Sequence, residues 1–273
     1  MITRIPFSIL SNNMITVPVT LNDEQHKFIF DTGIGITLIS KRTADSLKLK
    51  TDGVFYGKRM SGQEVPITLS TISSLEVGFI KKKEVIAGIF DMSGFPHEFD
   101  DISGILSPGF FKDIVFTVNN QNKEILLGDG NTKMVEHGTF SVPIEVVEDG
   151  PSVSIFIELI LLSGRRVKVE VDTGSDSLIL NSRYMDELNI AKEEPKTKKF
   201  KGTDETGNGF IRYFSTINGS ISIADAEEIN VLNPKVIFQD IIYDGLIGTD
   251  FLKRYNVTYD LHNRTIGFSS FKA

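Results

Sequence analysis

Two aspartates, Asp31 and Asp172, each follow a short apolar segment and begin the sequence Asp-Thr-Gly, and they lie 141 residues apart (172 − 31). The preceding residues, Phe28–Phe30 and Val169–Val171, alternate in the manner of a strand with one buried face. A carboxylate at the end of a buried strand is costly unless hydrogen bonds or a partner compensate it. Because the chain carries two such sites, we expect each aspartate to be the other's partner.

Two carboxyl groups within about 3 Å of each other cannot both ionise, so they share one proton. The ionised member is then a base that takes a proton from water, and the protonated member is an acid that donates to a substrate carbonyl. Water attacks directly in such a site, and no Ser or Cys nucleophile is required. The paired aspartates therefore predict hydrolysis at a carbonyl group.

The 141-residue offset continues beyond the two aspartates and identifies an internal repeat. It keeps its register over roughly 110 residues of each copy. Matched pairs include Leu21 with Leu162, Lys27 with Lys168, Gly104 with Gly245, Thr117 with Thr258, and Asn122 with Asn263. A chain of 273 residues suits two domains of ordinary size. We therefore expect two homologous lobes, residues 1–135 and 136–273.

Short strands with turn signals every ten residues or so predict an all-β protein made of two closed β-barrel lobes. One or two short helices are expected in each lobe: Ser40 caps a helix that runs to about Leu49, and Asn181 caps a helix that ends at Ile190. Ile211–Ile223 is expected to be one strand. The helices are too few to supply the crossovers of a parallel α/β sheet.

The segments Phe28–Ser40 and Val169–Asn181 resemble the active-site loops of aspartic peptidases of the pepsin and retropepsin type. Asp244–Tyr255 resembles the C-terminal segment of that family, and Ile102–Leu127 is its weaker copy. The lobe length is closer to the retropepsin unit, doubled in one chain. The resemblance implies two lobes related by a pseudo-twofold axis and an aspartic endopeptidase whose catalytic pair lies in a cleft between them.

The same resemblance implies supporting residues around Asp31 and Asp172. The hydroxyls of Thr32 and Thr173 interlock across the lobe interface in this family. Gly33 and Gly174 allow backbone N–H groups to reach the carboxylates, and Ser175 follows the second motif as the family pattern has it. Hairpins fold over the site as flaps, for which the candidate residues are Tyr56, Gly57, Gly62, Gly202 and Gly207.

Ile34 departs from the family pattern, which has Ser or Ala after the first Asp-Thr-Gly. Its side chain cannot donate a hydrogen bond to the carboxylate, and losing a donor raises the pKa of an acid. We therefore expect Asp31 to be the protonated member of the pair and activity to extend toward neutral pH. A branched side chain at this position could instead disturb the pair.

Composition limits the partners. A net charge of −7 argues against nucleic acid as the main partner, and no segment approaches the length of a membrane span. The absence of cysteine excludes thiolate catalysis and Cys-based metal sites, and the four histidines show no metal-ligand spacing. We expect a peptide or protein substrate, no metal or organic cofactor, and a monomer, because both halves of the site are present in one chain.

Two further interpretations stay open at this point. The chain could be a catalytically inactive peptide-binding module that retains the aspartic-peptidase fold, or a self-processing enzyme that cleaves its own precursor. We expect a cytoplasmic location, because the N-terminal apolar patch is too short for a signal peptide; a leader removed earlier would instead indicate a secreted or periplasmic protein.

Overall fold

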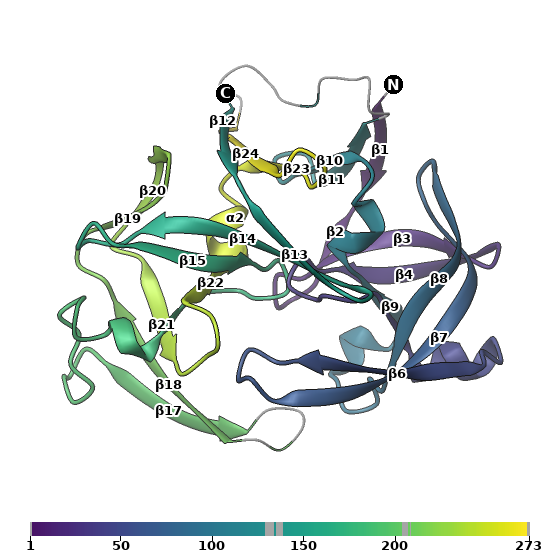
Figure 1. The fold of residues 1–273 in the computed structure, drawn as a ribbon, viewed down its shortest axis with the longest axis horizontal. Helices are drawn as coiled ribbons and strands as arrows, with labels where there is room; N and C mark the ends of the chain where they lie inside the picture. Colours follow the sequence, from purple (N-terminus) through teal and green to yellow (C-terminus); the bar gives the residue numbers. More distant parts are fainter. Residues whose placement is uncertain (1, 129–133, 135–138, 204–206, 208, 272–273) are drawn as a thin grey trace.

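Strands form most of the fold in the computed structural model, which describes residues 2–128, 134, 139–203, 207 and 209–271. They form three sheets, of eight, ten and six strands (Figure 1). The described residues contain two short α-helices and three 3-10 helices: α1 (Lys41–Ser46), α2 (Thr249–Leu252), η1 (His97–Phe99), η2 (Pro108–Phe111) and η3 (Ser182–Tyr184). The predicted all-β, two-lobe fold class is confirmed.

The eight-stranded sheet belongs to the first half of the chain. Its strands, in spatial order, are β2 (Ser8–Ile9), β3 (Ile15–Leu21), β4 (Glu24–Phe30), β9 (Ile102–Leu106), β5 (Leu38–Ser40), β8 (Ile80–Phe90), β7 (Glu64–Val77) and β6 (Thr51–Lys58). An additional pairing of β3 with β7 closes the inner six strands into a barrel. The β3/β4 hairpin turns at Asn22 and Asp23, both at positive φ (47° and 68°), the conformation that a two-residue hairpin loop requires.

The ten-stranded sheet repeats this arrangement in the second half. Its path runs through β17 (Lys198–Thr203), β18 (Gly209–Thr216), β21 (Lys235–Gln239), β16 (Leu178–Asn181), β22 (Gly245–Ile247), β15 (Arg166–Val171), β14 (Ser152–Ile160), β19 (Ser220–Ile223) and β20 (Ala226–Leu232), and β13 (Glu145–Asp149) pairs with β14. β18 is followed along the chain by β19, and β19 pairs with β14. The chain connection from β18 to β19 therefore closes the circuit of strands in this half.

The strand registers follow the 141-residue offset. Phe28 pairs with Gly104 in the first half, and Val169 pairs with Gly245 in the second. These two glycines are needed for space: a Cβ on Gly245 would lie 2.4 Å from the carbonyl oxygen of Ile179. The same local sequence thus builds the same crossing of strands in both halves.

The six-stranded sheet is shared by the two halves. Its order is β1 (Ile2–Pro6), β11 (Glu124–Gly128), β10 (Val115–Asn119), β23 (Asn256–Asp260), β24 (Thr265–Ser269) and β12 (Phe140–Pro143). At its centre Thr117 pairs with Thr258, its own counterpart in the repeat, and their hydroxyls are hydrogen-bonded at 2.8 Å. The pseudo-twofold axis passes between these two residues. The expected lobe boundary at residues 135 and 136 lies outside the described residues.

The hydrophobic core is continuous through this shared sheet. The ring of Phe116 stacks on Tyr259 at a centroid distance of 4.7 Å and contacts Phe30 and Phe111 at 5.8 and 4.9 Å. Phe30 is the residue that precedes Asp31, so the strand that carries the first aspartate packs on Phe116 of the shared sheet, which in turn stacks on Tyr259 of the second half.

Three secondary-structure expectations were wrong. The helix predicted from Asn181 to Ile190 is a 3-10 helix of three residues followed by turns, and the first helix ends at Ser46 instead of about Leu49. The strand predicted from Ile211 to Ile223 is interrupted between β18 and β19, where Gly219 has a φ of 141°. No helix in the described part of the chain is long and apolar enough to cross a membrane.

Candidate active site

Parallel strand pairing delivers the two aspartates to the same place. β4 pairs with β9, and the N–H of Asp31 continues the ladder by donating to the carbonyl oxygen of Leu106 at 3.1 Å. β15 pairs with β22 in the same way, and the N–H of Asp172 donates to Ile247 at 3.0 Å. Each aspartate is therefore held at the end of a buried strand, as the sequence predicts.

The threonines of the two motifs interlock between the halves. The N–H of Thr32 donates to the hydroxyl of Thr173, and the N–H of Thr173 donates to the hydroxyl of Thr32, both at 3.0 Å. Each hydroxyl in turn donates to a carbonyl of the opposite half: Thr32 to Val171 at 2.7 Å and Thr173 to Phe30 at 3.2 Å. Thr32 is fully buried, and Thr173 is nearly so. These four bonds fix the two motifs relative to each other.

The carboxyl groups of Asp31 and Asp172 meet across this interface and are hydrogen-bonded to each other. Each also lies directly against the glycine of the opposite motif. A Cβ on Gly33 would lie 2.4 Å from Cγ of Asp172, and a Cβ on Gly174 would lie 2.3 Å from Oδ2 of Asp31. Glycine is required at both positions because any side chain would occupy the space of the opposite carboxyl group.

Backbone N–H groups hold the two carboxyl groups unequally. Oδ1 of Asp31 accepts from Gly33 at 2.8 Å and from Ile34 at 3.2 Å. Oδ1 of Asp172 accepts from Gly174 at 2.8 Å. The N–H of Ser175, the counterpart of Ile34, contacts the backbone carbonyl of Asp172 at 3.5 Å instead. Asp31 thus has the stronger set of donors for a negative charge.

The electrostatics of the pair follow this asymmetry. Burial raises the pKa of both aspartates, but the N–H of Gly33 and the hydrogen bond from Asp172 hold the pKa of Asp31 down. After burial, the negative charges of Asp31 and Glu170 raise the pKa of Asp172 further. The additional backbone donor favours Asp31 as the ionised member of the pair and Asp172 as the member that carries the proton. This is opposite to the expectation drawn from the Ile34 side chain, because the backbone N–H of Ile34 supplies a donor that the side chain lacks.

The first predicted flap is the hairpin of β6 and β7, and its tip is bound to the second half. The N–H of Ile242 donates to the carbonyl oxygen of Met60 at 2.8 Å, and the Met60 side chain packs on a cluster that contains Ile179 and Leu246. Gly62 turns the tip at a φ of 85°, and Tyr56 on β6 is 61% exposed. Gly57 also lies on β6, where a Cβ would be 2.9 Å from Ile67.

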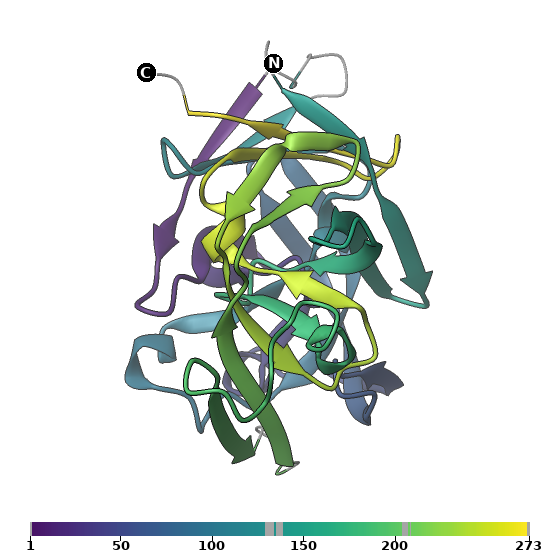
Figure 2. The ribbon, with the colours of Figure 1, turned by 90° about the vertical axis from the view of Figure 1, so that its left-hand side faces the viewer.

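The second predicted flap is the hairpin of β17 and β18. Gly202 lies on β17 between the rings of Phe200 and Phe210, and a Cβ there would be 2.7 Å from each. Gly207 has a φ of 83°, and residues 204–206 and 208 lie outside the described residues. Both hairpins project from the end of the molecule opposite to the six-stranded sheet (Figures 1 and 2).

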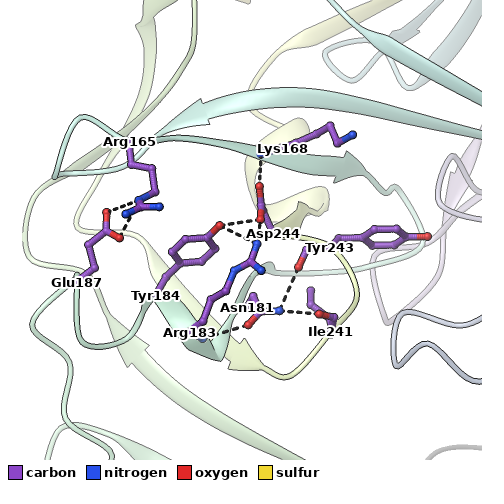
Figure 3. Close-up of polar contacts among 9 residues, drawn as sticks. All are labelled: Arg165, Lys168, Asn181, Arg183, Tyr184, Glu187, Ile241, Tyr243 and Asp244. Atoms are coloured by element: carbon purple, nitrogen blue, oxygen red, sulfur yellow. Dashed lines mark hydrogen bonds and ion pairs between the residues drawn. The ribbon is translucent and has the colours of Figure 1, made fainter.

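A polar network supports the loop that receives Met60. The Asn181 side chain donates to the carbonyl oxygens of Ile241 at 2.6 Å and Tyr243 at 3.3 Å (Figure 3). Asp244 forms an ion pair with Arg183 and accepts from the Tyr184 hydroxyl at 2.7 Å.

The same carboxylate accepts a hydrogen bond from the N–H of Lys168 at 2.8 Å. Burial opposes the charge of Asp244, but the hydrogen bonds from Tyr184 and Lys168 hold its pKa below the ordinary value. The Tyr243 side chain points away from this network (Figure 3). The sequence analysis did not identify either the network or the contact of Met60 with Ile242.

Glu170 is a third carboxyl group beside the pair that the sequence analysis did not single out. It is 6% exposed, and burial raises its pKa to about 8 despite a hydrogen bond from Ser154; the charge of Asp31 acts in the same direction as burial. The repeat carried a signal for it, because Glu170 falls on Ile29 in the 141-residue register. A carboxyl group at a position that is apolar in the other copy indicates a role that the shared fold does not require.

Comparison with known families agrees with this geometry. Residues 17–128, which include Asp31, match the model of a family described as aspartyl protease. Residues 160–254, which include Asp172, match the model described as gag-polyprotein putative aspartyl protease. No curated protein matches the chain. The two matches lie in tandem on the two copies of the repeat, and the chain therefore belongs to the aspartyl proteases, with two retropepsin-like lobes in one polypeptide.

Proposed function

We propose that this protein is an aspartic endopeptidase that hydrolyses peptide bonds with water activated between Asp31 and Asp172. The observation that supports this most strongly is the meeting of two hydrogen-bonded carboxyl groups from distant parts of the chain, each against the glycine of the opposite motif. Such a pair supplies a base and an acid at the same time, which is what the direct attack of water on an amide requires.

In the first step Asp31 takes a proton from water as the water oxygen bonds to the carbonyl carbon of the substrate. Asp172 gives its proton to the carbonyl oxygen. The product is a tetrahedral diol, with Asp31 protonated and Asp172 ionised. The backbone N–H groups of Gly33 and Ile34 stabilise the negative charge of Asp31 before this step.

In the second step the bond from carbon to nitrogen breaks. The leaving nitrogen takes the proton from Asp31, and Asp172 takes a proton from one hydroxyl of the diol. A carboxylic acid and an amine leave, and both aspartates return to their starting protonation states. The hairpin tip at Met60 covers bound substrate in this proposal, and it excludes bulk water during both steps.

A single chain supplies both acids, so the proposal needs no second copy of the protein. The substrate is a peptide or an unfolded protein segment, and the net charge of −7 does not favour a nucleic acid partner.

The test is incubation of the purified protein with a diverse peptide library at several pH values, with products read by mass spectrometry and an aspartic-peptidase inhibitor as control. Asp31→Asn and Asp172→Asn are each expected to lower kcat by about 10²–10⁴-fold. Asp186→Asn is the matched control, because this exposed aspartate in the second half lies outside the site.

Cleavage that disappears in both site variants and persists in the control supports the endopeptidase. Peptide binding without turnover by the unmodified protein, at every pH tested, would instead identify a binding module that retains the fold.

A further inference from the structure

Glu170 lies near the end of β15, two residues before Asp172, whose N–H continues the strand ladder by donating to Ile247. Side chains two residues apart on a strand point to the same side, about 6.6 Å from each other. The other face of the strand carries Val167, Val169 and Val171, which are buried in the core. Glu170 therefore points out of the barrel on the side where the reacting carboxyl groups lie, and its charge acts on both of them.

The surroundings of Glu170 are aromatic and apolar. Phe156 lies opposite on β14, Leu246 lies beside it on β22, and the ring of Tyr243 contacts that of Phe156 at 5.1 Å. Burial and, after it, the charge of Glu170 raise the pKa of Tyr243, so this side chain lies near the carboxyl group. The hydroxyl of Ser154 is its hydrogen-bond donor.

Glu170 has no cationic partner among the described residues. Lys168 is nearest along the strand, but its ammonium group pairs with Glu145 at 3.0 Å and lies over the ring of Phe156. In the described part of the chain, Glu170 is not part of a group of acids that could hold a metal ion. A buried carboxyl group without a cation is costly and gains most from a positive group that arrives with a ligand.

The equivalent position in the first half carries an apolar residue that only packs. Its counterpart, Ile29, is 2% exposed and packs in a cluster with Phe99 and Ile102. The fold therefore accepts an apolar residue here, and the carboxyl group of Glu170 is not required to build the strand. Buried ionisable groups beside reacting groups are candidates for a functional role.

We propose that Glu170 makes this site select a substrate with an arginine or lysine side chain next to the scissile bond. This inference rests on the proposed function. The side chain of a substrate residue next to the scissile bond reaches Glu170, because Glu170 and Asp172 are only two residues apart along the strand. The ring of Tyr243 suits the flat guanidinium group, which stacks on an aromatic face and pairs with a carboxylate at the same time, so arginine is favoured over lysine.

Binding of the cation ionises Glu170 and releases its proton to solvent. The other charged or titratable groups that face it are Asp31, Asp172, Tyr243 and Lys168, and they are the same whichever peptide binds. A peptide with citrulline, the neutral isostere of arginine, provides the matched comparison because it keeps the shape and removes the charge.

The experiment measures kcat/KM for paired peptides that carry arginine or citrulline on either side of the scissile bond. The unmodified protein is expected to prefer arginine by at least about tenfold at one of the two positions. Glu170→Gln and Glu170→Leu are expected to bring that ratio close to one. Glu158→Gln, which removes an exposed carboxyl group from the adjacent strand β14, is expected to keep it.

A second measurement does not depend on turnover. Non-cleavable hydroxyethylene analogues with arginine or citrulline are titrated by calorimetry in two buffers of different ionisation heat. The arginine analogue is expected to bind more tightly and to release more protons than the citrulline analogue, and Glu170→Leu is expected to abolish both differences.

Equal use of arginine and citrulline by an active protein, or an arginine preference that survives in Glu170→Leu, overturns the inference and leaves the proposed function intact. Absence of cleavage with every peptide overturns the proposed function, and the calorimetric comparison then still decides the role of Glu170.

Discussion

The N–H of Ile242 donates to the carbonyl oxygen of Met60 at 2.8 Å, so the tip of a hairpin from the first half is bound to a loop of the second half. Hydrogen bonds of Asn181 to Ile241 and of Tyr184 to Asp244 fix the loop that contains Ile242. The position of this hairpin tip therefore depends on both halves, although the hairpin itself belongs to one.

Met60→Ala is expected to loosen this hairpin, because the side chain loses its contacts with Ile179 and Leu246. We expect a loss of about 2 kcal/mol in the free energy of unfolding and faster amide exchange over residues 59–63. Hydrogen exchange with mass spectrometry measures the effect, with the exposed Lys58→Ala as control. Equal exchange in the two variants would show that the side chain does not hold the tip.

Gly174→Ala is expected to displace Asp31, because the new methyl group would lie 2.3 Å from its Oδ2. The strain should cost about 1–3 kcal/mol of stability and should abolish the predicted peptide cleavage. Gly94→Ala is the matched control, since a Cβ there meets nothing within 4 Å. Chemical denaturation measures the stability of both variants, and similar losses in the two would contradict the proposed steric role.

Glu170→Gln is expected to change how stability depends on pH. The pKa of Glu170 is about 8 in the folded protein and 4.5 as the reference for the unfolded chain. Between these values the unfolded state has lost the proton that the folded state keeps, so the stability of the unmodified protein falls as pH rises.

The variant lacks this titration, and its stability relative to the unmodified protein should grow by up to about 1.4 kcal/mol per pH unit across that window. Unfolding in urea at several pH values from 5 to about 8 measures the difference. Glu158→Gln serves as control, and a constant difference between Glu170→Gln and the unmodified protein would refute the buried, protonated state.

Ile34→Ser is expected to move only one limb of the pH–rate profile. A serine hydroxyl adds a donor to the carboxylate of Asp31 and lowers its pKa, which shifts the acid limb to lower pH. The alkaline limb reports the loss of the proton from Asp172, and residue 34 makes no bond to that group, so it should stay in place. A shift of the alkaline limb alone would reverse the assignment of acid and base.

The repeat in the sequence predicts most of what the two halves share. Asp31 and Asp172, their threonines and their glycines are found together because each half folds in the same register, as the pairs of Phe28 with Gly104 and Val169 with Gly245 show. Alternation of apolar residues identifies strands of this kind, because the side chains of a strand point to its two faces in turn.

The features that the sequence does not predict are found where the two halves differ from each other or are in contact. The bond between Ile242 and Met60 joins loops with no local signal for each other. The unequal hydrogen bonding of the two carboxyl groups depends on the backbone N–H of Ile34, which the identity of its side chain does not predict. Asn181 does act as a cap, its side chain accepting from the N–H of Arg183, but only the three residues Ser182–Tyr184 that follow it are helical.

The hydrogen bond between Thr117 and Thr258 has a consequence for how a ligand is oriented. In an assembly of two identical chains every position at the axis must face its own copy, and the left and right walls of the active site are the same. Joining the halves in one polypeptide removes that constraint. Ile29 and Glu170 occupy equivalent places with opposite chemistry, so a peptide that binds as proposed meets an apolar side chain on one side of the two aspartates and a carboxyl group on the other.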